Sequence, residues 1–272
     1  MRKDRLTAKN GSSYLALALR DRTGTLAARV FREADRLGLR FEAGDAVQVS
    51  GRIERFRGDL AAELNDIERI EPGSYDPGAF LPAAYRSVEE LEGFLEHLVS
   101  EVHHDGLRQV AAGLLLEGRY AEEFRRAPCT LWGHHAYLGG LIEHTVAVGT
   151  LVLETCQLHP RLNSDLLLAA ALVHDVGKVQ EFTYAAEFGI SEEGRMLGHL
   201  QLGAAMVSEA AQALLEPELR LALVNCVLSH HGPPDAARGR ERFATPEALA
   251  LFRVNALDAG VKGALESGLG RG

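Results

Sequence analysis

The chain has few cysteines and no long apolar segment. Its three cysteines, Cys129, Cys156 and Cys226, are widely separated and form no CxxC pair, so neither a disulfide framework nor a zinc finger is expected. The best apolar run is the eight residues 166–173, against the roughly 18 that a membrane-spanning helix needs. The N-terminus is charged and lacks the apolar region of a signal peptide. These absences predict a cytoplasmic protein with reduced thiols and no membrane partner.

Charge is unevenly distributed along the 272 residues. Residues 1–70 hold 14 Lys and Arg against 11 Asp and Glu, a net +3, whereas the remainder carries −12. A chain of this length is typical of one large or two ordinary domains. The charge split favours a small, mildly basic domain that binds a polyanion, joined to a larger acidic domain. The alternative is that a surplus of three charges is ordinary scatter.

Residues 1–70 alternate between apolar and polar positions, as short half-buried β-strands do. The alternating stretches are 6–8, 13–20, 25–31, 46–53 and 60–70, with glycine-containing turns between them. A helical turn at 33–37 is expected between the third and fourth strands. Five strands with a helix in that place predict an OB-fold barrel.

OB-fold barrels commonly bind single-stranded nucleic acid across their second and third strands. Arginines follow the phosphate backbone in such sites, and aromatic rings stack on bases. The candidate nucleic-acid-binding residues are Tyr14, Arg20, Arg22, Arg29, Arg55, Phe56 and Arg57. Phe31 is expected in the barrel core. The alternative is that these aromatic rings all belong to the core and the arginines to an ordinary solvated face.

Residues 71–84 begin with a stretch rich in Pro and Gly and are predicted to be a linker. Residues 85–272 lack convincing strand alternation. They predict helices at 87–102, 106–117, about 135–157, 164–173, 199–215, 217–229 and 246–266. The expected fold class is therefore multidomain, with an all-β OB-fold barrel at 1–70 followed by an all-α helical bundle at 85–272.

Eight of the eleven histidines lie between positions 134 and 231. Those that stand beside glycines or predicted helix ends are His144, His174-Asp175, His199 and His230-His231. Imidazole and carboxylate groups are ligands for Mn, Fe, Co, Zn or Mg. A single bridging aspartate can hold two ions, which activate water and neutralise the oxygens of a phosphodiester. The histidine pattern therefore predicts a metal site in the second domain.

The order His…His-Asp-x-Gly-Lys…His…His-His resembles the HD-domain metal-dependent phosphohydrolases. The longer stretches 132–145, 165–178 and 228–232 resemble the YhaM-type 3′→5′ exoribonucleases, which also carry an OB-fold ahead of the HD domain. Residues 9–15 resemble the beginning of that family's OB domain. The shared domain order covers nearly the whole chain.

The resemblance implies a set of metal ligands, position by position. His144, His174 and Asp175 match the ligands of a first ion. The histidines that match the additional ligands of two-metal HD proteins are His199, His230 and His231. Asp175 is then the expected bridge between the two ions.

The resemblance also implies catalytic residues and shows one departure from the family. Asp175 and Lys178 are the expected catalytic residues, with Lys178 contacting the scissile phosphate; the alternative for Lys178 is a surface lysine in a loop. Asn255 stands where the family has a ligating Asp, and its neutral amide oxygen is a weaker metal ligand. Asp258 lies three residues further on, where it either replaces that ligand or supports one from outside.

The implied function is a metal-dependent phosphodiesterase, most closely a 3′→5′ exoribonuclease on single-stranded RNA, or also DNA, held by the OB domain. The expected ion is Mn²⁺, with Co²⁺, Mg²⁺, Fe²⁺ or Zn²⁺ as alternatives, in one or two copies. Two other functions stay open: a phosphodiesterase for cyclic or short oligonucleotides, and a nucleic-acid-binding protein whose HD domain is degenerate at Asn255. Assembly into homo-oligomers would increase the reach of such a protein along its substrate.

Overall fold

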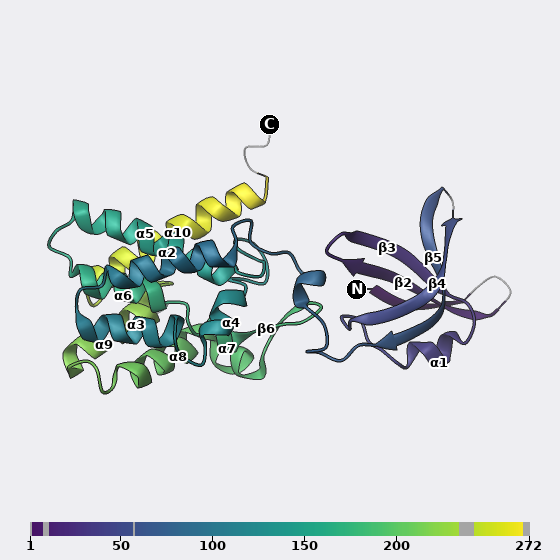
Figure 1. Cartoon of the computed structure of the whole chain (residues 1–272), viewed down its shortest axis with the longest axis horizontal. Coiled ribbons are helices and arrows are strands. Elements are labelled where there is room, and N and C mark those ends of the chain that lie inside the picture. Colours follow the sequence, from purple (N-terminus) through teal and green to yellow (C-terminus); the bar gives the residue numbers. More distant parts are fainter. Residues whose placement is uncertain (1, 8–10, 57, 234–241, 269–272) are drawn as a thin grey trace. The chain divides into compact units, whose positions relative to one another are not determined.

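A computed structural model describes residues 2–7, 11–56, 58–233 and 242–268. The chain divides into two compact units (Figure 1). The first contains residues 1–82 and 184–188, and the second contains residues 83–183 and 189–272. Across the described ranges, every helix is too short or too polar to span a bilayer.

The first unit is built on a five-stranded sheet in the order β1-β2-β3-β5-β4. Its elements are β1 Arg2–Thr7, β2 Ser13–Asp21, β3 Gly24–Val30, α1 Ala34–Gly38, β4 Val47–Phe56 and β5 Asp59–Arg69. Neighbouring strands pair antiparallel, except that β3 and β5 are parallel. The alternation in β2 turns Leu15 and Leu17 into the core, where they meet Val30 and Ile67. The predicted OB-fold is confirmed.

Phe31 is not in the barrel core, so that prediction is wrong. Val30 at the end of β3 is fully buried, and Phe31, the next residue, is 45% exposed. The ring of Phe31 packs beside that of Tyr14, with their centroids 5.4 Å apart. Phe41 takes the buried aromatic position in the barrel instead.

The second unit is helical, as expected. Its helices are α2 Val88–Ser100, α3 Asp105–Leu115, α4 Ala121–Arg126, α5 Gly140–Leu158, α6 Ser164–Val173, α7 Lys178–Glu181, α8 Glu192–Ala211, α9 Pro217–Ser229 and α10 Pro246–Glu266. The sequence patterns did not indicate α4, α7, or the small two-stranded sheet of β6 Phe182–Tyr184 and β7 Phe188–Ile190. The 3-10 helix η1 Pro77–Ala79 lies in the predicted linker, within the first unit.

Two helices begin away from their predicted positions. α5 begins at Gly140 rather than near His135, because His135 and Gly139 have φ angles of 52° and 77° that an α-helix excludes. α8 begins earlier than predicted, after Ser191, whose hydroxyl accepts a hydrogen bond from the backbone N–H of Gly194. It kinks at Gly198, which has φ 72°, directly before His199. Both departures adjust the backbone beside a histidine.

Helix α6 forms the centre of the second unit. Its residues 166–173 are all buried, and it packs against α2, α3, α5, α9 and α10. A helix that is apolar on every side belongs in the interior. The C-terminal end of α6 therefore carries His174 and Asp175 into the middle of the domain.

Candidate metal centre

Asp175 stands at the centre of a cluster of buried histidines. Its Oδ1 lies 3.2 Å from Nε2 of His230 and 3.6 Å from Nε2 of His199. Its Oδ2 lies 3.3 Å from Nε2 of His174 and 3.7 Å from Nε2 of His144. Helices α5, α6, α8 and α9 thus each place an imidazole around one carboxylate, either within the helix or at its end.

Backbone carbonyls fix the rings of two of these histidines. Nδ1 of His174 donates to the carbonyl of Ala171, and Nδ1 of His230 donates to that of Val227, both at 2.7 Å. A carbonyl only accepts, so each Nδ1 carries the proton. In the neutral ring, Nε2 then presents a lone pair to Asp175.

Carboxylates fix the other two rings in the same way, by contact with Nδ1. Nδ1 of His144 donates to Oδ2 of Asp258 at 2.6 Å, and Nδ1 of His199 lies 3.0 Å from Oε2 of Glu181. Such carboxylate partners are the usual outer support of metal-ligating histidines. In the neutral rings, the four Nε2 atoms therefore all face Asp175 as acceptors.

The cluster lacks the donors that these acceptors need. Nε2 of His144 lies 3.3 Å from Nε2 of His174. Two lone pairs facing each other do not form a hydrogen bond. In addition, Oδ1 of Asp175 and Nε2 of His230 are buried without a hydrogen-bond partner. A cation would satisfy these atoms, so the residues present fit a divalent metal ion.

Burial keeps the cluster in the protonation states that bind metal. It lowers the pKa of His230 to about 3 and that of His231 to about 4, with Asp175 opposing the shift in both cases. Burial raises the pKa of Asp175, but the positive charge of Lys178 outweighs it and holds that pKa well below its usual range. At neutral pH, two neutral imidazoles therefore face a charged carboxylate.

Lys178 is a buried residue of the centre, not a surface lysine. It is 4% exposed, and its Nζ donates to Oδ2 of Asp175 at 2.6 Å and to Sγ of Cys129 at 3.4 Å. Burial lowers the pKa of Lys178, but Asp175 outweighs this and raises it above the usual value. The ammonium group is therefore a fixed positive charge beside the central carboxylate.

Asn255 on α10 turns its amide oxygen toward the cluster. Nδ2 donates to the carbonyl of His230 at 3.2 Å, which fixes the orientation of the amide. Oδ1 then lies 3.0 Å from Nε2 of His144, a second acceptor. This pair of acceptors also fits a cation, and it leaves the amide oxygen where a ligand is expected.

Asp258 occupies an outer position. Its Oδ2 binds Nδ1 of His144 and also lies 3.1 Å from Nε2 of His135. Burial raises the pKa of Asp258, but the hydrogen bonds from His135 and His144 outweigh it and lower that pKa. Asp258 therefore contacts His144 through Nδ1, whereas Nε2 of that ring faces Asp175.

For several residues around the centre, the sequence did not indicate a role. Cys129 lies 3.8 Å from Oδ2 of Asp175, and burial raises the pKa of its thiol to about 12. His135, for which the sequence indicated no role, contacts Asp258 and the hydroxyl of Tyr137, and that hydroxyl donates to Glu143. No spacing rule links these residues to the histidines, because folding alone brings them together.

The predicted nucleic-acid-binding residues are divided between two faces of the sheet. Tyr14 and Arg20 share the outer face of β2, and Arg29 of β3 is paired with Ala16 on that same face. Arg22 is exposed in the turn between β2 and β3. In β4, Ile53 is paired with the buried Ala62, so Ile53 lies on the inner face of the sheet. Arg55, two residues further along the strand, lies on that same inner face.

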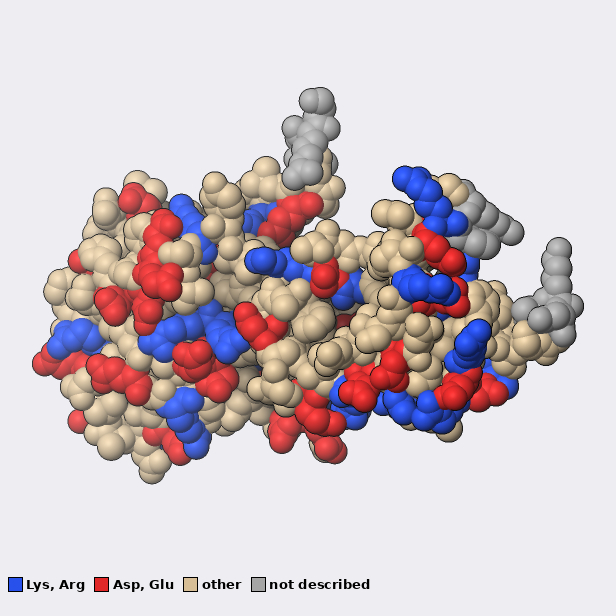
Figure 2. Space-filling view, turned by 45° about the vertical axis from the view of Figure 1, so that its right-hand side comes forward, with Lys and Arg blue, Asp and Glu red and all other residues tan. Residues whose placement is uncertain are grey.

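The remaining members of that set, the side chain of Phe56 and the whole of Arg57, lie outside the described residues. On the surface shown in Figure 2, Lys and Arg are interspersed with Asp and Glu over both units rather than gathered in one basic patch. The fold therefore places Tyr14, Arg20 and Arg29 on one face of the sheet and Arg55 on the other.

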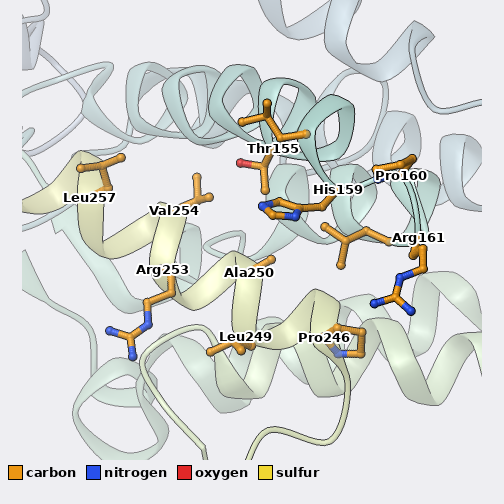
Figure 3. Close-up of a pocket in the computed structure, with 12 residues that line it drawn as sticks. Thr155, His159, Pro160, Arg161, Pro246, Leu249, Ala250, Arg253, Val254 and Leu257 are labelled. Carbon is orange, nitrogen blue, oxygen red and sulfur yellow. The ribbon is translucent and has the colours of Figure 1, made fainter.

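A cavity of about 1000 Å³ lies elsewhere in the second unit, between the C-terminal end of α5 and the N-terminal half of α10 (Figure 3). Its lining is Thr155, Leu158, His159, Pro160, Arg161, Leu162, Pro246, Leu249, Ala250, Arg253, Val254 and Leu257. None of the predicted site residues lines it. The metal centre is instead a closely packed cluster.

Comparisons with known proteins agree with this division of the chain. Residues 141–260 match the family described as HD domain, and residues 1–70 match the OB-fold nucleic acid binding domain. The 3′-5′ exoribonuclease YhaM of Listeria welshimeri is 27% identical over 257 residues, covering 94% of this chain and 81% of the relative. Those of Bacillus licheniformis and Bacillus subtilis are 28% and 27% identical over 254 residues, covering 93% of this chain and 80% of each relative. No solved structure matches the chain.

The fold and the buried histidine cluster define the class, an HD-domain hydrolase preceded by an OB-fold domain. Within that class, the chain is similar along nearly its whole length to proteins named 3′-5′ exoribonuclease YhaM.

Proposed function

We propose that this protein is a metal-dependent 3′→5′ exoribonuclease that acts on single-stranded RNA. The observation that carries the proposal is the set of imidazole Nε2 atoms facing Asp175, in a chain that also has an OB-fold domain. The relatives named 3′-5′ exoribonuclease support the direction of cleavage. The substrate, the polarity of cleavage and the residue roles below are parts of the proposal.

The proposed first-ion ligands are His144, His174, Asp175 and Asn255, with Asp258 supporting His144. His199, His230 and His231 would complete a second position, since their ligand atoms and one from Asp175 lie within 4.8 Å of one another. A bound divalent ion, for which we propose Mn²⁺, supplies charge for the phosphate oxygens and lowers the pKa of water. The donor atoms are compatible with other divalent ions.

Lys178 has the chemistry of a phosphate-binding group. Its ammonium is held by Asp175 on one side and by the neutral thiol of Cys129 on another, in the buried interior of the domain. A fixed positive charge in a buried site interacts strongly with an anion. We assign to Lys178 the neutralisation of charge on the scissile phosphate.

The OB-fold unit would hold the rest of the strand. Tyr14 offers a ring for base stacking, and Arg20 and Arg29 offer positive charge on the same outer face of the sheet. Arg22 extends this charge into the turn. Arg55 lies near the end of β4, and together with Phe56 and Arg57 it stays a prediction for a separate contact.

Two other functions make different predictions. A phosphodiesterase for cyclic or short oligonucleotides would hydrolyse dinucleotides without any contribution from residues 1–70. A binding protein with a degenerate HD domain would bind RNA and leave its length unchanged. The position of the Asn255 oxygen beside Nε2 of His144 favours a working centre over the degenerate one. A cytoplasmic location and assembly into oligomers stay predictions from the sequence.

The test uses a 5′-labelled single-stranded RNA with Mn²⁺, with and without chelator. A ladder that shortens from the 3′ end, and that is absent with chelator and in the double variant His174→Ala/Asp175→Ala, supports the proposal. RNA that is shifted in a gel but keeps its length contradicts it and favours the binding protein. Cleavage of dinucleotides alone favours the second function.

A further inference from the structure

A short loop, residues 130–134, is anchored at both ends in the metal centre. At its beginning, Cys129 lies against Asp175 and Lys178. At its end, the ring of His135 binds Asp258, which itself binds His144. The two ends of the loop therefore cannot move without disturbing the histidine cluster.

Hydrogen bonds close this loop on itself. The backbone N–H of Cys129 donates to the carbonyl of His135 at 3.1 Å, and the hydroxyl of Thr130 donates to the carbonyl of His134 at 2.7 Å. Gly133 adopts φ 100°, in the left-handed region, as a tight reversal requires. The apex of the loop is thus held in place rather than free to collapse onto the surface.

Trp132 occupies that apex and is 84% exposed. It lies three positions from each anchor, a distance of at most about 11 Å along the chain. Tryptophan is usually packed against other residues over most of its surface. Here a rigid loop instead presents an indole ring to solvent within reach of the cluster, which is the arrangement of a stacking platform.

A second aromatic ring of the same loop lies closer to the cluster. The ring centroid of His134 is 5.8 Å from that of His144 and 5.9 Å from that of His135. His134 is half-buried and stands between Trp132 and the anchor His135 in the sequence. The loop therefore also places a planar ring directly beside the histidine cluster.

We propose that Trp132 stacks on a base close to the 3′ end of single-stranded RNA and so positions the terminal phosphodiester at the metal centre. The inference rests on the proposed function and deepens it, because it names the group that recognises an unpaired base. Base–aromatic stacking is tolerant of sequence, since every base has a π face. The enzyme would therefore require unstacked bases without requiring a particular one.

The first experiment uses the intrinsic fluorescence of the full chain with Mn²⁺. Trp132 is the only tryptophan in the sequence, so the signal reports this side chain alone. The titrant is a single-stranded RNA whose 3′-terminal linkages are phosphorothioates, which slow cleavage. We expect saturable quenching by this RNA and none by polyphosphate, which has charge but no bases. Free N-acetyltryptophanamide corrects for light absorbed by the RNA.

The second experiment measures RNA shortening by variants. Trp132→Ala is expected to raise KM roughly 5- to 100-fold, the effect of removing one base stack, with kcat nearly unchanged. Trp132→Phe retains a ring and should recover most of the wild-type KM. Leu221→Ala, which removes another exposed apolar side chain of the same domain, is the matched control.

The two experiments separate this inference from the proposed function. If the wild-type protein leaves RNA intact, the proposed exoribonuclease activity is contradicted. The fluorescence titration still tests whether Trp132 stacks on a base. Unchanged fluorescence at RNA concentrations that saturate a gel shift overturns the role of Trp132. A wild-type KM in Trp132→Ala overturns it as well.

Discussion

A histidine binds a cation only through a nitrogen that carries no proton, and in this centre four acceptors keep the proton on the other nitrogen. Ala171 and Val227 do so with backbone carbonyls, and Asp258 and Glu181 do so with carboxylates. The ligand histidines could be predicted from their order in the sequence. Their partners could not, because each contact depends on the tertiary position of a carboxylate or a helix turn.

At position 255 the chain has an amide where a carboxylate is expected. Asn255→Asp adds a negative charge beside His144, and we expect Mn²⁺ to bind roughly tenfold more tightly, because the charge of the ligand set controls affinity for hard cations. Calorimetric titration measures the affinity. Gln157→Glu adds the same charge at the end of α5, about 20 Å from His144 along the helix, and serves as the control. Equal affinity in Asn255→Asp and wild type would show that residue 255 is not a ligand.

Asp258 supports His144 without facing the central carboxylate. Asp258→Asn keeps a similar shape but removes the charge that orients the ring, so we expect metal affinity to fall roughly 10- to 100-fold. Glu266→Gln, on the same helix, removes a carboxylate that binds the backbone N–H of His135 instead, and its affinity should fall less. A titration in which both variants bind Mn²⁺ alike would contradict this difference.

At the scale of elements, close approach of helices determines where His174, Asp175 and His199 meet. Gly177 follows the end of α6, and a Cβ added to it would lie 2.2 Å from the carbonyl oxygen of His199 and 2.5 Å from the backbone N of Gly203. The φ angle of Gly177 is −61°, so the backbone conformation itself does not require glycine. Glycine is required because α8 packs too closely to leave space for a side chain. The glycine of the His-Asp-x-Gly-Lys motif therefore allows α8 to pack closely against the turn between α6 and α7.

Gly177→Ala should consequently destabilise the helical unit. We expect a decrease of about 1–3 kcal/mol in the free energy of unfolding, the usual cost of forcing a methyl group into a filled space. Urea unfolding followed by the helical circular dichroism signal measures it. Gly93→Ala on α2 is the matched control, since its Cβ meets nothing within 4 Å and alanine favours a helix. A Gly177→Ala protein as stable as Gly93→Ala would contradict the packing argument.

At the scale of the whole molecule, the two compact units have separate cores and separate tasks. Because the proposed ligands all belong to the second unit, metal binding stabilises that unit. At a free Mn²⁺ concentration about 100 times Kd, we expect about 2.7 kcal/mol of added stability, since the ion binds only the folded site. Differential scanning calorimetry should show the transition of the helical unit moving upward with Mn²⁺ while that of the barrel stays in place. The control is the His174→Ala/Asp175→Ala variant, in which we expect no such shift. A shift that persists in this variant would show that the ion binds elsewhere.

The barrel should contribute affinity for RNA that depends on salt. Arg20→Ala removes one charge from the outer face of β2, so we expect weaker binding and a slope of log K against log salt that is smaller by about one. Arg36→Ala on α1 removes a charge that pairs with Glu33 and is the control. Fluorescence anisotropy of a labelled RNA at several salt concentrations provides both quantities. Identical salt dependence in Arg20→Ala and Arg36→Ala would remove Arg20 from the interface.

The sequence alone determined the barrel, the helical unit and the histidines of the centre. Strand alternation identifies the OB-fold because side chains in a strand point alternately to opposite faces, and the apolar run 166–173 identifies α6 as a central helix. With Val30 inside, the same rule places Phe31 on the opposite face, so the prediction of a core Phe31 did not follow from the alternation.

Only the tertiary structure decided how the centre is completed. It placed Lys178 in the interior, turned the oxygen of Asn255 toward His144, and joined Asp258 to Nδ1 of His144. It also held Trp132 at the apex of a loop anchored by Cys129 and His135. These arrangements depend on contacts between residues more than 100 positions apart in the case of His144 with Asn255 and Asp258. Local sequence patterns report neighbours along one helix or strand, and they carry no information about which distant side chain completes a site.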